Sequence, residues 1–389
     1  MARPSPPEHG AAVLCGLGGW VPPRVVDNAE LSARLDTTDA WITERTGIRY
    51  RRHIEPGQAT SDLAVEAGRR ALSSAGGEPP DAVLVATTTP DRPCPATAPA
   101  VAARLGLGGV PAFDVAAVCT GFLYGLATAS GLLATGAARR VLLIGADAYS
   151  TIVDPDDRTN AVIFGDGAGA VVLRPGTPDE LGALGPFDLG SDGTGEDLIT
   201  VRAGGSRQRS DRGGDEPARG DRFFAMHGRA VYRQAVTRMT DSARAVLDAA
   251  DWKPDAVGHI VPHQANLRIL RSVAEHLGLP AERLVTNIRH IGNTGAASVP
   301  LALCDAAAEG RLASGDGVLL TAFGGGLTWG STLLRWPALA PPTRPTDPTD
   351  PAEAAHTADQ AGAHGTTDTA DPTDPRPGTP RTPAPKEHA

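Results

Sequence analysis

FDVAAVCTGFLYGLATASGLLA, residues 113–134, joins a strand pattern directly to a helix pattern. The run Phe113–Val118 predicts a buried strand, and an Ala-, Gly- and Leu-rich helix is expected to follow from Cys119. Cys119 therefore lies at a helix N-terminus, where free N–H groups and the helix dipole favour thiolate over thiol. A buried structural cysteine is the alternative interpretation, because that is the commoner fate of a single cysteine. Small residues would let this helix lie deep in the molecule, namely Gly121, Gly125 and Ala127.

The sequence around this stretch repeats itself. DAVLVA at 81–86 and DAV at 255–257 each follow a proline and a helical pattern. Further along, LATG leads into VLLIG over 133–145, and LASG leads into VLLTA over 312–322. The order agrees and the offset is nearly constant, so the matches predict internal duplication. We expect an N-terminal half and a C-terminal half, which span 11–176 and 177–336.

Both halves alternate short β-branched or Leu-rich runs with longer Ala-rich stretches. This alternation is typical of an α/β fold in which helices pack on sheets. The expected strands are 81–87, 140–146, 168–173, 256–261 and 317–323. The expected helices are 61–75, 97–105, 120–135, 226–250, 265–277 and 296–309.

Composition excludes several classes of protein. The net charge of −9 and the pI of about 5.6 argue against a nucleic-acid partner and against an anionic membrane surface. No apolar run approaches the roughly 18 residues of a membrane helix. The four cysteines are far apart and form no metal-type pair, so we expect a cytoplasmic protein with reduced thiols and no metal. Residues 1–10 predict a flexible N-terminus, and the Pro-, Thr- and Asp-rich residues 337–389 predict a disordered tail.

Two further polar residues follow strand or loop signals in the second half. His263 comes directly after the expected strand 256–261, at a strand-to-helix corner. Asn293 lies in a Gly-flanked loop that opens another small-residue helix, and three glycines follow the last strong strand at 324–326. Alone, His263 fits a loop or cap and Asn293 fits a turn. Together with Cys119 they suggest a cysteine that carries an acyl group, two neutral donors for an enolate oxygen, and backbone N–H groups for an oxyanion.

With these residues in place, the chain resembles the thiolase-fold condensing enzymes, specifically β-ketoacyl-acyl-carrier-protein synthase III, from about Ala11 to Trp336. The shared motifs are AAVCTGF at 116–122, FGDGAGA at 164–170, VPHQAN at 261–266, GNT with AAS at 292–298, and AFGGGLTWG at 322–330. The resemblance implies a five-layered αβαβα fold built from two pseudo-duplicated halves, with a disordered C-terminal tail outside the pattern.

The resemblance also implies roles for individual residues. The catalytic triad would be Cys119, His263 and Asn293, and the oxyanion hole would use the N–H groups of Cys119 and Gly325. Coenzyme A would contact a group of early residues and one later arginine, which are Thr37, Trp41, Arg45 and Arg158. The acidic carrier protein would meet Arg233, Gln264 and Arg268.

The implied reaction has two halves. Cys119 takes a short acyl group from acyl-CoA, and malonyl-acyl-carrier protein then loses CO₂ and attacks the Cys119 thioester. No cofactor is required, because acyl-CoA is a substrate. A homodimer is expected from the resemblance, with residues 92–94 approaching the pocket of the partner, and the charged residues 204–221 are expected to form a surface loop near the entrance.

Several alternatives share part of this pattern. A starter-unit enzyme or an acyltransferase of a polyketide or other secondary-metabolite pathway would share every motif, although Asn293 favours condensation over simple acyl transfer. A thiolase would carry a second cysteine in the late loop, and a papain-like hydrolase would carry Cys-Gly-Ser-Cys-Trp around its nucleophile. Neither is present. An inactive partner subunit would have lost Cys119. The acyl chain itself cannot be read, because one methylene shifts binding by only about 1–3 kcal/mol.

Overall fold

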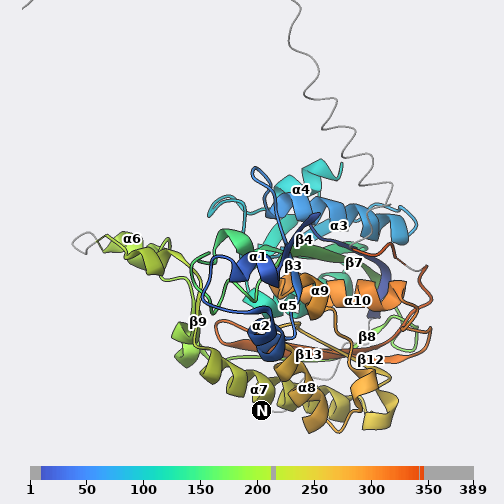
Figure 1. Cartoon of the computed structure of the whole chain (residues 1–389). Coiled ribbons are helices and arrows are strands. Elements are labelled where there is room, and N and C mark those ends of the chain that lie inside the picture. The colour runs from blue at the N-terminus through green and yellow to red at the C-terminus, as the bar shows by residue number, and fades with distance from the viewer. Residues whose placement is uncertain (1–9, 212–215, 341, 346–389) are drawn as a thin grey trace, which may run out of the picture. The chain divides into compact units, whose positions relative to one another are not determined.

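Two sheets form the centre of the computed structural model, which describes residues 10–211, 216–340 and 342–345 (Figure 1). The first sheet has the order β1-β7-β6-β4-β5, and its strands are β1 (Ala11–Trp20), β7 (Asp166–Gly176), β6 (Val141–Ala148), β4 (Ala82–Ala86) and β5 (Ala112–Val115). The second has the order β11-β12-β13-β8, with β11 (His259–Pro262), β12 (Gly317–Gly324), β13 (Thr328–Arg335) and β8 (Leu184–Ser191).

The two sheets repeat the same topology. In the first, β1 is antiparallel to β7, β7 is antiparallel to β6, and β6 is parallel to β4. In the second, β8, β13, β12 and β11 follow one another with the same three relations. Even β5, which pairs in parallel with β4, has a remnant counterpart, because Leu284 forms an isolated parallel bridge with Ile260 of β11. The predicted duplication is confirmed, and each half supplies one sheet.

Helices complete five layers, α-β-α-β-α, as predicted (Figure 1). The outer face of the first sheet carries α3 (Thr60–Ser74) and α4 (Ala98–Arg104), and the outer face of the second carries α7 (Gly228–Ala249) and α8 (Leu267–His276). Between the sheets lie α5 (Gly121–Ala134) and α10 (Ser298–Ala308). These six helices match the expected ones to within two residues at either end.

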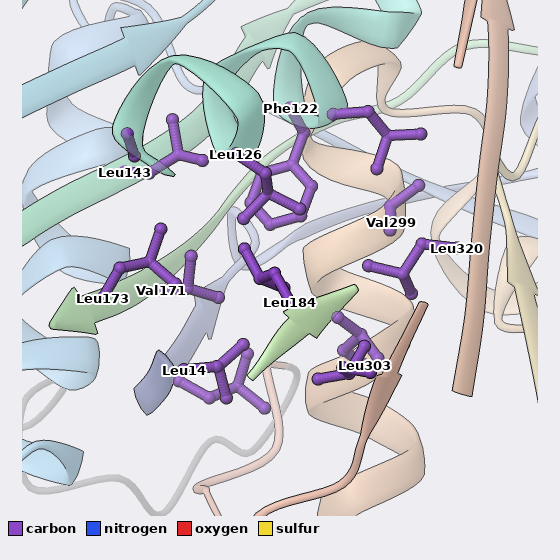
Figure 2. Packing of buried hydrophobic residues seen from close by; sticks show 14 of the residues in the cluster. Leu14, Phe122, Leu126, Leu143, Val171, Leu173, Leu184, Val299, Leu303 and Leu320 are labelled. Carbon is purple, nitrogen blue, oxygen red and sulfur yellow. The ribbon is translucent and has the colours of Figure 1, made fainter. Parts of the chain in front are cut away.

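Figure 2 shows why the two central helices can be covered on both sides. Phe122 and Leu126 of α5 pack with Val299 and Leu303 of α10, and aliphatic side chains of both sheets close around them. Burying each Leu or Val contributes about 1.5–3 kcal/mol. A Cβ on Gly125 would lie 2.5 Å from Leu143, so the prediction that small residues let α5 lie deep is confirmed there.

Shorter elements decorate this framework. The remaining α-helices are α1 (Asn28–Ser32), α2 (Asp39–Thr46), α6 (Ser206–Ser210) and α9 (Ile288–Ile291). The remaining strands form two small sheets, β2 (Arg24–Asp27) with β3 (Tyr50–His53) and β9 (Ile199–Thr200) with β10 (Ala225–Met226). The 3-10 turns are η1 (Val118–Thr120), η2 (Tyr149–Thr151), η3 (Gly193–Leu198), η4 (Arg219–Arg222), η5 (Pro254–Ala256), η6 (Ala281–Arg283) and η7 (Gly295–Ala297).

The strand expectations need three corrections. The strand before Cys119 ends at Val115 and is not buried, because β5 is an edge strand and Phe113 is 37% exposed. The strand expected at 256–261 begins only at His259, since Pro254 starts η5. The pattern also missed β1, β8 and β13. In β1 the glycines that weaken a strand signal are needed for packing, because a Cβ on Gly18 would lie 2.3 Å from the backbone nitrogen of Ala71 in α3.

The ends of the chain are only partly described. The predicted flexible N-terminus lies outside the described residues except for Gly10, and most of the predicted tail does so as well. The start of that tail, however, was wrongly predicted as disordered. Leu339 packs against the central core, and Arg344 pairs with Glu309 at 2.7 Å. The compact unit therefore continues past Trp336.

Residues 204–211 and 216–221 lie mostly exposed in a surface projection that carries α6 (Figure 1), and residues 212–215 lie outside the described part. The predicted surface position is confirmed for the described residues, and the predicted position near the entrance stays a prediction. Within the described ranges, the structure contains no helix long and apolar enough to span a bilayer.

Candidate active site

Cys119 lies between the first sheet and the start of a central helix. The chain leaves β5, turns through η1 and enters α5 at Gly121. The turn requires Val118 to adopt φ +48°, a region that a β-branched residue enters only under strain of about 1–3 kcal/mol. Cys119 itself is buried, with 7% of its surface exposed. The surrounding fold therefore holds the sulfur at a strained, enclosed corner.

The resting sulfur is a thiol. Burial and the nearby Asp147 carboxylate raise the pKa of Cys119 to about 12, while the Tyr149 hydroxyl and the backbone N–H of Cys119 act in the opposite direction. The backbone N–H at the helix start does act in the expected direction, but it does not decide the charge of this sulfur. Desolvation of the thiolate in the closed interior outweighs the helix-terminus effect, because the free energy lost with its hydration is larger than the free energy gained from the helix dipole.

The starts of the two central helices meet at this point. Each begins with a 3-10 turn, η1 before α5 and η7 before α10, and the two turns pack against each other. A Cβ on Gly121 would lie 3.6 Å from the Cβ of Ala296. Asp147 of β6 fastens the arrangement, since its carboxylate accepts from the N–H groups of Ala296 and Thr88, both at 2.7 Å. The duplication thus brings equivalent helix starts, with Cys119 on one side, into a single site.

His263 enters the site from the end of β11. Its backbone N–H donates to Thr321 of β12 at 2.8 Å, and its Nδ1 lies 2.6 Å from the hydroxyl of Ser298, the first residue of α10. The Ser298 oxygen also accepts from the N–H of Gln264, which leaves the hydroxyl hydrogen available for Nδ1. In that arrangement the neutral ring carries its proton on Nε2. Burial lowers the pKa of His263 to about 3. The residue is therefore a neutral donor.

Asn293 is held by its own backbone and side chain. Its N–H donates to Ile163, its carbonyl accepts from Gly165 at 2.9 Å, and it forms a bridge with Phe164. Its Oδ1 accepts from the N–H of Gly295 at 3.0 Å, which leaves the amide NH₂ as the group that can donate to a ligand. Asn293, like His263, is buried and neutral.

The glycine loop after β12 rests on the nucleophile. A Cβ on Gly324 would lie 2.9 Å from the backbone nitrogen of Cys119, so only glycine permits this approach. The hydroxyls of Thr120 and Thr328 are 2.6 Å apart, and Thr328 also donates to the carbonyl of Gly325. The loop that contains Gly325 is thereby tied to the turn that contains Cys119.

The residues predicted for coenzyme A also gather together. Trp41 of α2 has the guanidinium of Arg45 5.6 Å from its ring centre and that of Arg158 at 5.7 Å. Arg158 donates to the backbone carbonyl of Asp36 at 2.7 Å, next to Thr37. The Thr37 hydroxyl has no hydrogen-bond partner among the described residues. Two guanidinium groups flank one half-buried indole, and one of them, Arg158, also pairs with the Asp36 carboxylate at 3.1 Å.

The residues predicted to bind the carrier protein differ in their exposure. Arg233 of α7 and Arg268 of α8 are exposed on helices that pack against each other. Gln264, by contrast, is completely buried and was wrongly assigned to a binding surface. Its amide donates to the carbonyls of Pro262 and Val285 and accepts from Asn287, so it braces the loop that carries His263. The sequence contains no signal that tells whether a polar residue next to a catalytic one points outward or inward.

Sequence reasoning missed several residues that the structure places in or near the site. Ser298 orients His263, Asp147 joins the two halves, and Tyr149 contacts the sulfur of Cys119. Ser298 belongs to the AAS part of the motif at 292–298 and lies at the predicted start of a helix. That position was the only sequence signal for its role, because its contact with His263 is made only in the fold. Asp147 lies near the end of β6 and Tyr149 directly follows it, and nothing local marks either residue, so their contacts depend on tertiary structure.

Comparisons with known proteins agree with this geometry. Residues 113–193 match the family described as 3-oxoacyl-[acyl-carrier-protein (ACP)] synthase III, and residues 247–336 match the family of its C-terminal part. The chain is 61% identical over 333 residues to β-ketoacyl-[acyl-carrier-protein] synthase III 3 of Streptomyces coelicolor, covering 85% of this chain and 99% of the relative.

Solved structures show the same likeness. The 3-oxoacyl-(acyl carrier protein) synthase III of Pseudomonas aeruginosa PAO1 superposes with a TM-score of 0.79 at 51% identity, over 85% of this chain and all of that one. The priming β-ketosynthase of the R1128 polyketide pathway also gives 0.79, at 35% identity, over 87% of this chain and 99% of that one.

The duplicated five-layered fold with a buried cysteine at the meeting point of its halves defines a thiolase-like condensing enzyme. The chain belongs to the β-ketoacyl-acyl-carrier-protein synthase III family.

Proposed function

We propose that this enzyme condenses a short acyl-CoA with malonyl-acyl-carrier protein, with loss of CO₂, and so initiates fatty acid synthesis. The observation that carries the proposal is the pair of neutral donors. Nδ1 of His263 and Oδ1 of Asn293 are each engaged by a hydrogen bond, which leaves Nε2 of His263 and the NH₂ of Asn293 for a ligand. Such donors suit an enolate oxygen, because they stabilise developing charge without transferring a proton to it.

In the first half-reaction, the Cys119 sulfur attacks the acyl-CoA carbonyl. The new bond joins that carbon to Sγ, the bond to the CoA sulfur breaks, and the thiol proton leaves with CoA. Backbone N–H groups of Cys119 and Gly325 are proposed to hold the tetrahedral oxyanion, in keeping with the close approach of the glycine loop to Cys119. His263 is not arranged as a base here, because its Nδ1 is already occupied by Ser298.

In the second half-reaction, malonyl-carrier protein loses CO₂ and its enolate oxygen receives hydrogen bonds from His263 and Asn293. The carbanion attacks the Cys119 thioester, the carbon–sulfur bond breaks, and β-ketoacyl-carrier protein leaves. The buried setting strengthens both hydrogen bonds, because water does not compete for the oxygen. The proposed reaction needs no metal or redox cofactor.

The nucleotide of CoA is proposed to stack on Trp41 between Arg45 and Arg158, with Thr37 as a further hydrogen-bonding group. Replacing Trp41 with alanine should raise KM for acyl-CoA about tenfold and change kcat little, since stacking with a cation is worth roughly 1–2 kcal/mol. Steady-state kinetics test this. The matched control is an acyl-pantetheine, which lacks the nucleotide and should be used equally well by both proteins. Equal losses with both thioesters would contradict the assignment.

An acidic carrier protein is proposed to dock on the exposed arginines of α7 and α8. Arg229 and Arg271 extend the pair formed by Arg233 and Arg268, and all four are exposed without an ion-pair partner within the part of the chain that the structure describes. In a chain of net charge −9, such a face attracts an acidic partner over the rest of the surface.

We also propose a cytoplasmic homodimer. β5 and β8 are open edges of the two sheets, and each presents an exposed apolar side chain, Phe113 at 37% and Leu189 at 38%. Tyr124 of α5 donates to the carbonyl of Gly190 at 2.8 Å, so α5 lies beside the edge strand β8. An unpaired apolar edge is a template for pairing with a second chain.

Replacing Phe113 with aspartate should therefore halve the mass in solution, because it places a charge in the proposed interface. Light scattering coupled to size exclusion measures this. Val25→Asp is the control, since Val25 is even more exposed, at 45%, but lies on the separate small sheet of β2. A wild-type protein that runs as a monomer would rule out the dimer.

Intact-mass spectrometry tests the proposed reaction. The protein is offered a panel of short acyl-CoAs, and we expect one acyl adduct on Cys119. Adding malonyl-carrier protein should remove the adduct and yield β-ketoacyl-carrier protein with CO₂. An adduct that water alone discharges would indicate a hydrolase, and no adduct with any acyl-CoA would defeat the proposal.

A second candidate is the priming of a polyketide or other secondary metabolite. The priming β-ketosynthase of the R1128 pathway and the Pseudomonas synthase superpose on this chain with the same TM-score, 0.79. This equal structural similarity supports the second candidate. The same experiment separates the two, because the adduct mass identifies the acyl group and the accepting carrier protein identifies the pathway type. The second candidate would be selected if the acyl group is transferred to malonyl-loaded carrier protein of polyketide synthesis but not to that of fatty acid synthesis.

A further inference from the structure

Tyr149 lies at the centre of an aromatic cluster beside the nucleophile. It is the first residue of η2, immediately after β6, and its side chain is fully buried. Its ring stacks on Phe164 at 4.5 Å between centres and meets Phe224 edge to face at 5.5 Å. These contacts fix the ring, so the position of its hydroxyl is set by packing rather than by the hydroxyl's own bonds.

The hydroxyl of Tyr149 points at the reacting sulfur. Its oxygen lies 3.9 Å from Sγ of Cys119 and 3.5 Å from the hydroxyl of Thr88. We propose that Tyr149 is a further catalytic residue, whose hydroxyl donates a hydrogen bond to Cys119 Sγ whenever that sulfur carries negative charge. This inference rests on the proposed function for its place in catalysis, although the contact itself does not.

The surroundings of the sulfur explain why a donor is needed. Cys119 is buried, and Asp147 places a carboxylate nearby that opposes a second negative charge. The other titratable group that lines the site, His263, is neutral and supplies no opposing charge. Burial and the neighbouring acids raise the pKa of Tyr149 well above its usual value, so the phenol keeps its proton and remains a donor at any physiological pH.

The sulfur carries charge twice in the proposed cycle. In acylation, the bond from Sγ to the acyl carbon forms, the bond to the CoA sulfur breaks, and the thiol proton ends on CoA. In condensation, the bond from Sγ to the acyl carbon breaks, and the Cys119 thiolate then takes a proton from solvent. Tyr149 transfers no proton in either step. It supplies a hydrogen bond to the nucleophile in the first and to the leaving group in the second.

Alkylation of Cys119 measures this contact directly. The Tyr149→Phe variant keeps the ring and its stacking and removes only the hydroxyl. We expect its rate with iodoacetamide to fall about tenfold at each pH between 7 and 9, the equivalent of raising the Cys119 pKa by about one unit. The control is Tyr124→Phe, which removes a hydroxyl that bonds to Gly190 of β8 instead, and it should alkylate like the wild type.

A second variant has the opposite expected sign. Thr88→Val removes the competing acceptor of the Tyr149 hydroxyl while keeping the Thr88 N–H that donates to Asp147. The hydroxyl hydrogen is then left for the sulfur, so alkylation should be faster than in the wild type. Unchanged alkylation in Tyr149→Phe, or a slowing in both variants, would overturn the inference.

These outcomes are separate from the proposed function. Alkylation needs no acyl-CoA, so it reports on the Tyr149–Cys119 contact even if no acyl adduct forms. If the wild type acylates, Tyr149→Phe should also slow single-turnover acylation by a similar factor, with KM for acyl-CoA unchanged. If Tyr149→Phe slows alkylation but leaves acylation normal, the hydrogen bond from Tyr149 to the sulfur acts only in the free enzyme. That result would overturn the catalytic role.

Discussion

Replacing Cys119 with alanine should abolish the acyl adduct and lower condensation by on the order of 10⁴-fold or more, the scale seen when a nucleophile is removed from a catalytic set. The fold should survive, because alanine fits the space that the thiol occupies beside Gly324. Intact-mass spectrometry after exposure to acyl-CoA and a carrier-protein condensation assay measure the two effects. Any residual decarboxylation of malonyl-carrier protein would come from His263 and Asn293, which the substitution leaves in place.

Cys94→Ala is the matched control for this prediction. Cys94 is a free, exposed thiol in a surface loop, so it should react with alkylating reagents but carry no acyl group in turnover. The variant should form the acyl adduct on Cys119, as the wild type does. An adduct that persists in Cys119→Ala and disappears in Cys94→Ala would place the nucleophile at Cys94 and refute the assignment of Cys119.

The second large effect is expected at His263. In His263→Ala the enolate loses one of its two neutral donors, and removing one such donor from an enclosed site costs about 10²–10³ in rate. Condensation and CO₂ release should fall by that factor. Acylation of Cys119 should fall much less, because the first half-reaction generates no enolate. Acylation followed by intact mass, compared with CO₂ release, separates the two steps.

Two variants sharpen the interpretation of His263. Ser298→Ala leaves the ring but frees its tautomer, so condensation should fall by a smaller factor, about tenfold, since only the wrongly protonated fraction is lost. His276→Ala removes an exposed histidine of α8 and should have no effect. If His263→Ala slowed acylation and condensation equally, His263 would be acting on the nucleophile or on folding rather than on the enolate.

Local patterns predicted those parts of the fold that depend on local periodicity. All six main helices and the strands β4, β6, β7 and β12 follow from alternating apolar runs and Ala-rich stretches, and the repeat at 81–86 and 255–257 identified the duplication. The failures have one physical source. A strand such as β1 carries glycine where a neighbouring helix approaches, and the exposure of β5 depends on its place at the sheet edge, which no local pattern encodes.

The site shows the same division. Cys119, His263, Asn293 and the glycine loop were identified from motifs, and the structure brings their elements together around the starts of α5 and α10. Gln264 was misassigned because neighbouring residues in a motif can point in opposite directions, and it turns inward to brace the loop. Side-chain direction in a loop is decided by packing partners that lie far away in sequence.

By itself, the sequence determined which groups are available: one cysteine at a strand-to-helix corner, two polar residues in the repeated half, and glycines where backbones must approach. Only the tertiary structure decided their chemical state. Burial beside Asp147 makes Cys119 a thiol, the Ser298 hydroxyl engages Nδ1 of His263, and aromatic packing directs the Tyr149 hydroxyl to the sulfur. The reason is that pKa and donor direction depend on desolvation and on neighbours from distant segments, and these neighbours exist only once both halves have closed on each other.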